Sequence, residues 1–233
     1  MTEGTGSGVA ARLPFRDRHQ AGSALAVALE PVFARRRVLL GDVVVLGLAR
    51  GGVPVAAVVA DNLAVALDVL VVRKLGVPGH RELAIGAVAS GDVVVRNDEV
   101  LSRLADPERV LAEVLAAERA VLHERERRYR GGRPPVDLAE RYVVLVDDGL
   151  ATGTSMRAAV RAVRRQRAVT VVAAAPVGSP SAVDLLAGEA DEVVCAAVPA
   201  RFGAVGSFYR DFRQTSDDEV VAALERLEGR PGL

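Results

Sequence analysis

YVVLVDDGLATGTSM, residues 142–156, joins a run of aliphatic side chains to two adjacent carboxylates and a short segment rich in glycine and threonine. The uninterrupted apolar run Val143–Val146 predicts a buried strand, and the pattern from Thr154 onward predicts a helix that ends at Arg165. A strand, a glycine-containing loop and a helix in this order are typical of a βαβ unit in a parallel sheet.

The alternation of strands and helices continues on both sides of this unit. Apolar runs predict further strands at Val43–Leu48, Leu67–Val72, Val169–Ala174 and Glu192–Ala197, and extended chain at Leu83–Ala89 and Val93–Val95. We expect helices over 53–63, 107–129 and 181–186, the second capped by Asp106, and a mobile loop over 75–82. The predicted fold class is α/β, an open and mainly parallel twisted sheet with helices on both faces, whose ligands lie beyond the carboxyl ends of the strands.

Composition narrows the classes of function. The 30 basic and 30 acidic residues balance, so the chain lacks the basic excess of a dedicated nucleic-acid or anionic-membrane binder. Three charged residues interrupt the longest apolar stretch, 43–72, so no transmembrane helix is predicted. The single cysteine, Cys195, excludes an intrachain disulfide and a cysteine-based zinc site and fits a reducing compartment. We therefore expect a cytoplasmic protein with a disordered start at 1–12 and one domain at 13–233, in which a helix at about 107–130 is an insertion.

The loop that follows the strand at Val143–Val146 has the chemistry of a phosphate site. The backbone N–H groups of Leu150–Ser155, three hydroxyls and the positive end of the next helix form a cradle for a phosphate monoester. Gly149 and Gly153 let the backbone approach a phosphate closely. The adjacent carboxylates can accept hydrogen bonds from vicinal hydroxyls, so the pattern indicates a sugar phosphate.

Other interpretations of the same residues are less favoured. Thr154 stands where a Walker A loop needs lysine, and the spacing of Gly149 and Gly153 does not fit G-x-G-x-x-G. The remaining alternative is an ordinary strand-to-helix turn in which the two acids only cap the strand end.

The segment VVLVDDGLATGTS resembles the phosphoribosyl-diphosphate (PRPP) motif of type I phosphoribosyltransferases, and the resemblance extends from about Phe15 to Val220. It is closest to small bacterial phosphoribosyltransferase-domain proteins of unassigned acceptor. The resemblance implies the fold of that family, a small hood built from the N- and C-terminal segments, and a homodimer. It also implies that Asp147 and Asp148 bind the ribose hydroxyls and contact Mg²⁺ only indirectly or through them. The PRPP-binding loop would comprise Gly149, Leu150, Ala151, Thr152, Gly153, Thr154 and Ser155, with the 5-phosphate held by the last five.

Two further segments take their roles from the resemblance. Arg50, Gly51 and Gly52 correspond to the loop that grips pyrophosphate, and a cis peptide bond is expected before Arg50. Arg73 and Lys74 begin a segment that is similar to the mobile loop that closes over the diphosphate, where closure excludes water. Without the resemblance, the first segment is a tight strand-to-helix turn and the second a solvated charged hairpin.

The predicted C-terminal hood, about 198–233, contains four of the eight aromatic residues and is where we expect the acceptor to bind. The alternative is that these aromatic side chains only form the local core of a small C-terminal cap. Ala200 stands where purine enzymes of the family have a metal-binding aspartate, which weakens the transfer of that role. Ala151 stands where they have an aspartate that handles the base proton, which disfavours a 6-oxopurine acceptor. The candidate acceptor residues are Phe202, Phe208, Tyr209 and Phe212.

Four other features have simpler interpretations. His19 could reach the acceptor pocket, but a lone histidine before a helix is more often structural. His123 is expected in solvent and Cys195 in the core. The basic segment Arg125–Arg133 is the one candidate surface for a nucleic acid or a protein, and its glutamates favour a solvated helix end.

We therefore interpret the chain as an enzyme that transfers 5-phosphoribosyl from PRPP, with Mg²⁺, to a nitrogen acceptor such as a nucleobase and releases pyrophosphate. Asp147, Asp148 and Lys74 are the predicted catalytic residues. The expected partners are PRPP and a small-molecule acceptor, with neither nucleic acid nor membrane. Two alternatives stay open: a regulator that binds PRPP or a nucleotide without transfer, and a hydrolase of PRPP or a related sugar phosphate.

Overall fold

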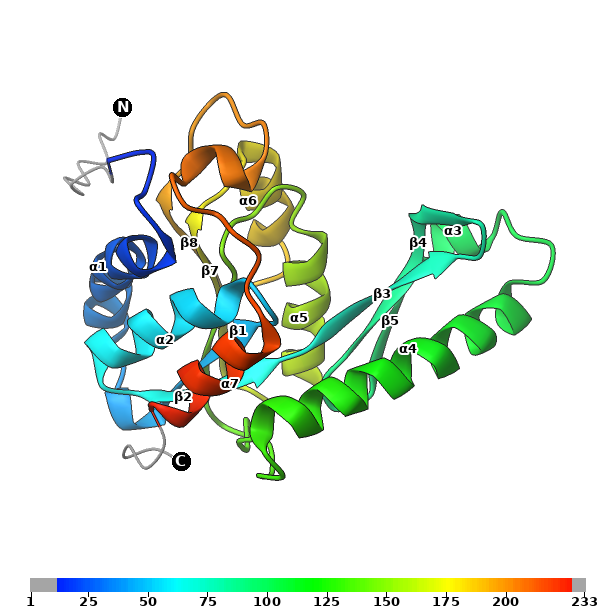
Figure 1. Cartoon of the computed structure of the whole chain (residues 1–233), viewed down its shortest axis with the longest axis horizontal. Coiled ribbons are helices and arrows are strands. Elements are labelled where there is room, and N and C mark those ends of the chain that lie inside the picture. Colours follow the sequence, from blue (N-terminus) through cyan, green and yellow to red (C-terminus); the bar gives the residue numbers. More distant parts are fainter. Residues whose placement is uncertain (1–11, 228–233) are drawn as a thin grey trace.

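The body of the protein is a five-stranded parallel sheet with the strand order β2-β1-β6-β7-β8 (Figure 1). The computed structural model describes residues 12–227, so nearly all of the predicted disordered start lies outside the described residues. The sheet confirms the predicted α/β class. Its strands are β1 (Val43–Leu48), β2 (Ala66–Leu70), β6 (Tyr142–Val146), β7 (Thr170–Val177) and β8 (Glu192–Ala197).

Helices cover both faces of this sheet. Alternate residues of β6 divide between two cores, because successive side chains of a strand point to opposite faces. Val144 belongs to the core beneath α1 (Arg18–Arg36) and α2 (Gly52–Leu63), whereas Val143 and Leu145 belong to the core beneath α5 (Thr154–Arg165) and α6 (Pro180–Ala187). Every residue of β1 and β6 is buried, which is the reason that their sequences are uninterrupted apolar runs.

A second, antiparallel sheet forms an arm beside the body (Figure 1). It consists of β3 (Val72–Val77), β4 (His80–Ala89) and β5 (Val93–Arg96), followed by the short helix α3 (Asp98–Leu101). The long helix α4 (Pro107–Arg130) packs along β3 and β4. As predicted, Asp106 caps α4, since its side chain accepts a hydrogen bond from the N–H of Arg109.

Two sequence expectations in the arm were wrong. Residues 75–82 do not form a loop, because β3 continues to Val77 and β4 starts at His80, with a tight turn in which Gly79 has φ = 79°. Leu75 and Val77 are buried in the core shared with α4, which stabilises this part of the hairpin as a strand. The predicted strand Leu67–Val72 is divided between β2 and β3, because Val71 donates its N–H to the side chain of Ser90 in the arm.

Segments from the N-terminal and C-terminal parts of the described chain meet in a hood above the sheet. Phe15 donates its N–H to the carbonyl of Phe208 at 2.8 Å and accepts from the N–H of Arg210 at 2.8 Å. Phe15 and Tyr209 share a small apolar cluster with Val177 of β7. The helix α7 (Asp217–Glu225) then returns to pack on α2 and α4, and two 3-10 turns lie at Leu40–Asp42 and Val205–Phe208. Among residues 12–227, no helix is both long enough and apolar enough to cross a membrane.

Candidate active site

Two loops meet at the carboxyl edge of the parallel sheet, one after β1 and one after β6. The first contains Arg50, Gly51 and Gly52, and the peptide bond between Ala49 and Arg50 is cis, which confirms the prediction. A Cβ on Gly51 would lie 2.1 Å from Oδ2 of Asp148, and one on Gly52 would lie 2.4 Å from the carbonyl oxygen of Val146. The overlap at Gly52 is with backbone atoms, so a glycine is required there for the two loops to touch, whereas Gly51 packs against the end of the Asp148 side chain.

The loop after β6 leads into an open helix N-terminus. Leu150 donates its N–H to Val177 at 2.9 Å and accepts from Ser179 at 2.8 Å, which fixes the start of the loop on β7. Gly153 caps α5 with φ = 72°, a left-handed conformation that favours glycine. The residues around this cap, Ala151, Thr152, Thr154 and Ser155, are exposed.

This helix N-terminus can hold a phosphate. The N–H groups of the first helical turn have no carbonyl partner within the helix, and the helix dipole adds positive potential. The Thr152 hydroxyl already lies 3.2 Å from that of Thr154, so the two hydroxyls point to the same region. The predicted phosphate cradle is thus assembled by residues that are adjacent in sequence.

Asp147 and Asp148 lie between the two loops. Oδ1 of Asp147 accepts the N–H of Asp148 at 2.9 Å. Burial raises the pKa of Asp147 to about 8, and the neighbouring negative charge of Asp148 adds to this shift. Burial also raises the pKa of Asp148, and the guanidinium of Arg18 opposes that rise. Both carboxyl groups therefore ionise less readily than a solvated aspartate, and a bound cation or hydroxyl donor would oppose this effect.

Arg18, at the first residue of α1, was not among the predicted site residues. Its Nε and Nη2 donate to Oδ2 of Asp148 at 3.1 and 2.8 Å, and its guanidinium carbon lies 4.2 Å from the centre of the Phe212 ring. The one sequence signal was its place in the charged segment beside His19, which gives no hint of a partner 130 residues away. Only the closure of the hood brings the three side chains together.

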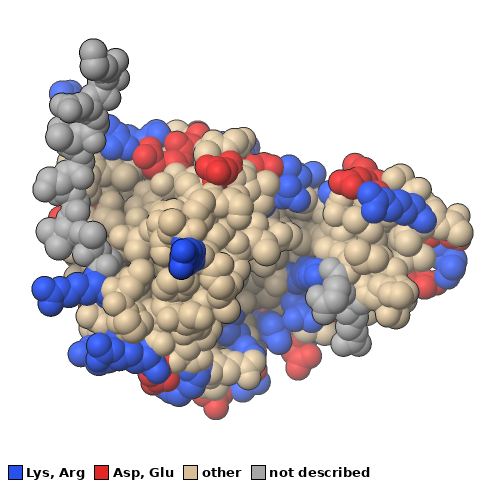
Figure 2. All heavy atoms as spheres, turned by 90° about the horizontal axis from the view of Figure 1, so that it is seen from above, with Lys and Arg blue, Asp and Glu red and all other residues tan. Residues whose placement is uncertain are grey.

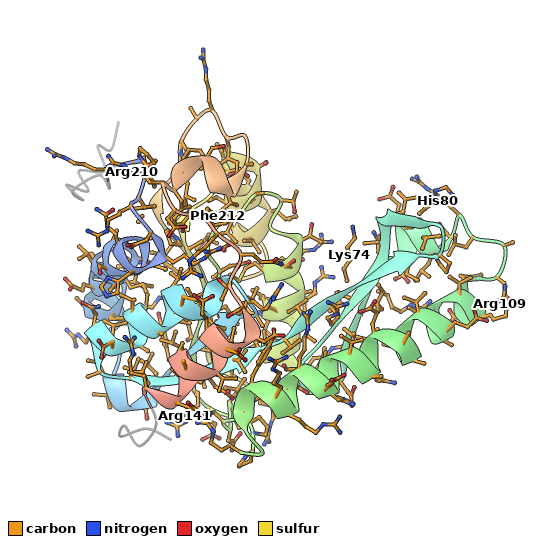
Figure 3. The ribbon with its side chains drawn as sticks, viewed as in Figure 1. Lys74, His80, Arg109, Arg141, Arg210 and Phe212 are labelled. Atoms are coloured by element: carbon orange, nitrogen blue, oxygen red, sulfur yellow. The ribbon has the colours of Figure 1, made fainter. Side chains whose placement is uncertain are left out.

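The predicted diphosphate-binding cations lie in different places. Arg50 is 3.8 Å from Asp217 of α7, a long ion pair. Arg73 is held by Glu118 of α4 at 2.7 Å, on the α4 side of the arm. Lys74 points from β3 to the other side, toward α5, and His80 lies near the end of the arm (Figure 3). The structure thus brings Arg50 to the aspartate pair, and it does not bring Arg73 there.

The four aromatic residues of the hood make different contacts. Tyr209 is buried and donates its hydroxyl to the carbonyl of Asp148 at 2.6 Å, and burial raises the pKa of that hydroxyl. The rings of Phe202 and Phe208 are in contact at a tilt of 39°, with their centres 5.0 Å apart. Phe212 lines a hollow of about 480 Å³ with Arg18, Arg50 and Asp148. Phe212 therefore reaches the aspartate pair, and Tyr209 orients its backbone.

The remaining candidates lie outside the aspartate site. His19 is exposed and lines an adjoining pocket of about 170 Å³, which shares Arg18 and Thr215 with the hollow beside Asp148. His123 is exposed, with Nε2 3.2 Å from Asp92, and Cys195 packs against the core, where burial raises its pKa to about 12. Both agree with the sequence interpretation. Within residues 12–227, no cluster of three or more His, Cys, Asp or Glu side chains is arranged to hold a metal.

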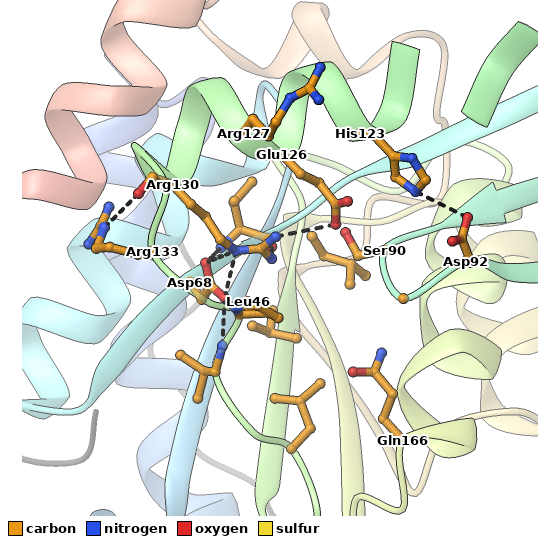
Figure 4. A pocket seen from close by; sticks show the side chains of 17 residues that line it. Leu46, Asp68, Ser90, Asp92, His123, Glu126, Arg127, Arg130, Arg133 and Gln166 are labelled. Carbon is orange, nitrogen blue, oxygen red and sulfur yellow. Dashed lines mark hydrogen bonds and ion pairs between the residues drawn. The ribbon is translucent and has the colours of Figure 1, made fainter. Parts of the chain in front are cut away.

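The basic segment 125–133 borders a second cavity, of about 500 Å³, under the base of the arm (Figure 4). Arg130 is buried there and donates to both oxygens of Asp68 at 3.0 and 3.1 Å, and its Nη1 donates to Glu126. Arg128 pairs with Asp217 and Asp218. These ion pairs neutralise much of the positive charge of the segment 125–133. Seen from above, side chains of both signs border a broad area that carries few charged side chains, and a notch separates the body from the arm (Figure 2).

The fold and the site together define an α/β protein in which a loop leading to an exposed helix N-terminus lies beside a carboxylate pair at the carboxyl edge of the sheet. The sequence model of the family described as "Phosphoribosyl transferase domain" matches residues 35–199. The chain therefore belongs to the phosphoribosyltransferase family.

Individual relatives agree with this assignment. The chain is 48% identical over 212 residues to "Putative phosphoribosyl transferase Rv0571c" of Mycobacterium tuberculosis, which covers 91% of this chain and 46% of the relative. The chain thus spans about half the length of that curated relative. The crystal structure of TT1426 from Thermus thermophilus is similar over 93% of this chain and 100% of that one, with a TM-score of 0.80 and 45% identity.

Proposed function

We propose that this protein transfers the 5-phosphoribosyl group of PRPP to a nitrogen acceptor, in the simplest case a nucleobase, and releases pyrophosphate. The observation that carries the proposal is the convergence of three elements at one edge of the sheet. These are the aspartate pair, the open N-terminus of α5 and the Arg50-Gly51-Gly52 loop, which are close enough for a Cβ on Gly51 to collide with Asp148.

Each part of PRPP has a matching group in this arrangement. The exposed N-terminus of α5 suits the 5-phosphate, and the carboxylates of Asp147 and Asp148 suit the ribose hydroxyls. Arg50 suits the diphosphate because Asp217 holds it loosely. The Arg50 guanidinium lies 3.8 Å from the carboxylate of Asp217. The same carboxylate accepts a hydrogen bond from the Tyr129 hydroxyl at 2.6 Å and another from Arg128 at 3.0 Å. Asp217 therefore keeps two strong partners when Arg50 moves to a ligand.

The same residues fit Mg²⁺ as the cofactor. Mg²⁺ is usually held by one or two carboxylates together with substrate phosphates, rather than by a cage of protein ligands. Asp147 and Asp148 supply two carboxylates, and the described part of the chain adds no third acidic or histidine ligand to them. When bound, the ion would neutralise charge on the diphosphate and the ribose hydroxyls.

The chain's own residues would stabilise separation of charge at the ribose. Arg50 would offset the charge of the departing pyrophosphate, and the aspartate pair would face the positive charge that grows on the ribose. The strands of the arm already contact α5. We propose that the arm moves further over α5 when PRPP binds, and that this movement brings Lys74 to the diphosphate. Exclusion of water by that movement would favour the nitrogen acceptor over hydrolysis.

Release of pyrophosphate from PRPP and Mg²⁺ is the direct test, measured with and without a panel of nucleobases. Release that requires a base supports transfer. Release without a base would identify a hydrolase, and binding of PRPP without release would identify a regulator. Asp147→Ala serves as the inactive control. The homodimer and the cytoplasmic location stay predictions, and light scattering of the purified chain tests the first.

A further inference from the structure

The hydroxyl group of Thr215 is buried and has no hydrogen-bond partner within residues 12–227. The described chain buries five residues of the types Ser, Thr, Asp and Arg, and four of them form side-chain hydrogen bonds. These four are Asp68, Ser90, Arg130 and Ser179, and Thr215, which is 4% exposed, is the fifth. A buried hydroxyl without a partner lowers the stability of the folded state, which makes Thr215 a candidate for contact with a ligand.

This hydroxyl faces an open space. Within the described chain, the Tyr142 hydroxyl is the side-chain group that is both unpaired and completely sealed. The Thr215 hydroxyl is also unpaired, so it must keep access to a cavity. Thr215 lines two cavities, the hollow of about 480 Å³ beside Asp148 and the adjoining pocket of about 170 Å³. The hydroxyl therefore opens into the space that these two cavities form.

Both cavities bring Thr215 to the Arg50-Gly51-Gly52 loop. Arg50 and Gly51 line the hollow with it, and Pro54, in the first turn of α2 directly after the loop, lines the pocket with it. Two positions further along the chain, Asp217 lies 3.8 Å from Arg50. The segment that contains Thr215 therefore runs beside the loop for which we propose the diphosphate.

The start of α7 holds Thr215 in place. Ser216 caps this helix, since its side chain accepts the N–H of Glu219 at 3.1 Å and its own N–H donates to the Glu219 carboxylate at 2.8 Å. The hydroxyl of Ser216 is thus used by the helix, and that of Thr215 is not. A donor that is fixed in this way loses little conformational freedom when it binds a ligand.

We propose that Thr215 is a substrate-binding residue whose hydroxyl donates a hydrogen bond to a diphosphate oxygen of PRPP, beside Arg50. This rests on the proposed transferase function. An O–H group that donates to a charged phosphate oxygen forms a short and strong hydrogen bond. It adds a directional contact and no charge, which suits a hollow that Arg18 and Arg50 already line with two guanidinium groups. The loop after β1 and the C-terminal segment would then hold the diphosphate together.

The experiment compares Thr215→Val, which replaces the hydroxyl with a methyl group of similar size, with Thr215→Ser, which keeps the hydroxyl. The matched control is Thr170→Val, because Thr170 begins β7 at the amino edge of the sheet, opposite the site. Calorimetry measures the binding of three ligands in the presence of Mg²⁺: PRPP, pyrophosphate, and ribose 5-phosphate, which has no diphosphate. Thermal unfolding without ligand measures the effect on the fold.

We expect Thr215→Val to bind PRPP and pyrophosphate about tenfold more weakly, because a hydrogen bond to a charged group is lost. Its affinity for ribose 5-phosphate should stay at the wild-type value, and its Tm without ligand should equal that of the wild type or exceed it, because no hydrogen bond of the fold is removed. Thr215→Ser should keep most of the affinity for PRPP, and Thr170→Val all of it. The proposal is overturned if Thr215→Val keeps the wild-type affinity for PRPP and pyrophosphate, if it weakens ribose 5-phosphate binding to the same extent, or if its Tm falls by several degrees.

Failure of the proposed function gives a different result. If the wild type binds PRPP but no base promotes release of pyrophosphate, transfer to these bases is refuted, whereas the affinities of the two Thr215 variants still decide the contact with the diphosphate. If the wild type binds neither PRPP nor pyrophosphate, both proposals are refuted.

Discussion

Substitution of Gly52 by alanine tests whether contact between the two loops is required for the site. The new Cβ would lie 2.4 Å from the carbonyl oxygen of Val146 and 2.9 Å from Cα of Asp147. Both are backbone atoms, so no side-chain rotation relieves the overlap. The loops must separate by roughly half an ångström or more, and a misplacement of about 1 Å at a catalytic group costs on the order of 100-fold in rate.

Two opposing effects set the stability of Gly52→Ala. Overpacking of a tight contact costs about 1–3 kcal/mol. Alanine at the first residue of α2 gains at most about 1 kcal/mol in helix propensity. The overlap should dominate, which predicts a decrease in Tm of several degrees, since each kcal/mol shifts Tm by about 2–4 °C in a chain of this size.

Thermal unfolding and PRPP kinetics of Gly52→Ala are compared with those of Gly188→Ala. A Cβ on Gly188 meets no atom within 4 Å, so this control adds the same methyl group without an overlap. We expect Gly52→Ala to lose about 10- to 100-fold in kcat/KM for PRPP while the control stays at the wild-type value. Equal Tm and equal kinetics in the two variants would refute the reasoning.

Three further predictions concern the carboxylates. Asp147→Ala should lower PRPP-dependent turnover by about 100-fold or more, and steady-state kinetics would contradict the assignment if turnover and PRPP affinity stayed at wild-type values. Burial raises the pKa of Asp147 from 3.8 to about 8, so the folded protein keeps a proton that the unfolded chain releases. This group therefore lowers stability as the pH rises from about 4 to 8. Asp147→Asn should make Tm less dependent on pH over that range, and an unchanged slope of Tm against pH would contradict the raised pKa. Arg130→Ala leaves Asp68 buried without its cation and should lower the free energy of unfolding by about 3–5 kcal/mol, measured by urea titration. The control Arg103→Ala removes an exposed ion pair with Glu99 and should lower the free energy of unfolding by less than about 1 kcal/mol.

Local patterns predicted the elements of the body well. The bounds of α5 and β8 agree with the sequence expectation at both ends, and those of β1 do as well. β1 is buried throughout and α5 is strongly amphipathic, so their apolar periodicity reflects the position of the sheet directly, whereas β8 is only partly buried. The geometry of the predicted phosphate loop was accessible for a related reason: strand β6, the loop and the N-terminus of α5 are consecutive in the chain.

The arm and the N-terminal helix were harder to predict. Gly and Pro at 76–79 indicated a loop, yet Leu75 and Val77 are paired with β4 and buried against α4, so tertiary packing overrides the local signal. The helix α1 contains Pro31 and was not predicted, although its buried residues follow a helical spacing from Ala21 to Phe33. Core burial on the sheet compensates for the weak local preference.

The sequence by itself determined the strands of the parallel sheet, the loop that leads into the N-terminus of α5 and the aspartate pair, because each arises from residues that lie within a few positions of one another. Only the tertiary structure decided which groups face that pair. Arg18 and Asp148 are separated by 130 residues, and Phe212 joins them from the far end of the chain. Their contact requires the segments around Phe15 and Tyr209 to pair as a hood over the carboxyl edge of the sheet, and local periodicity does not encode such long-range pairing.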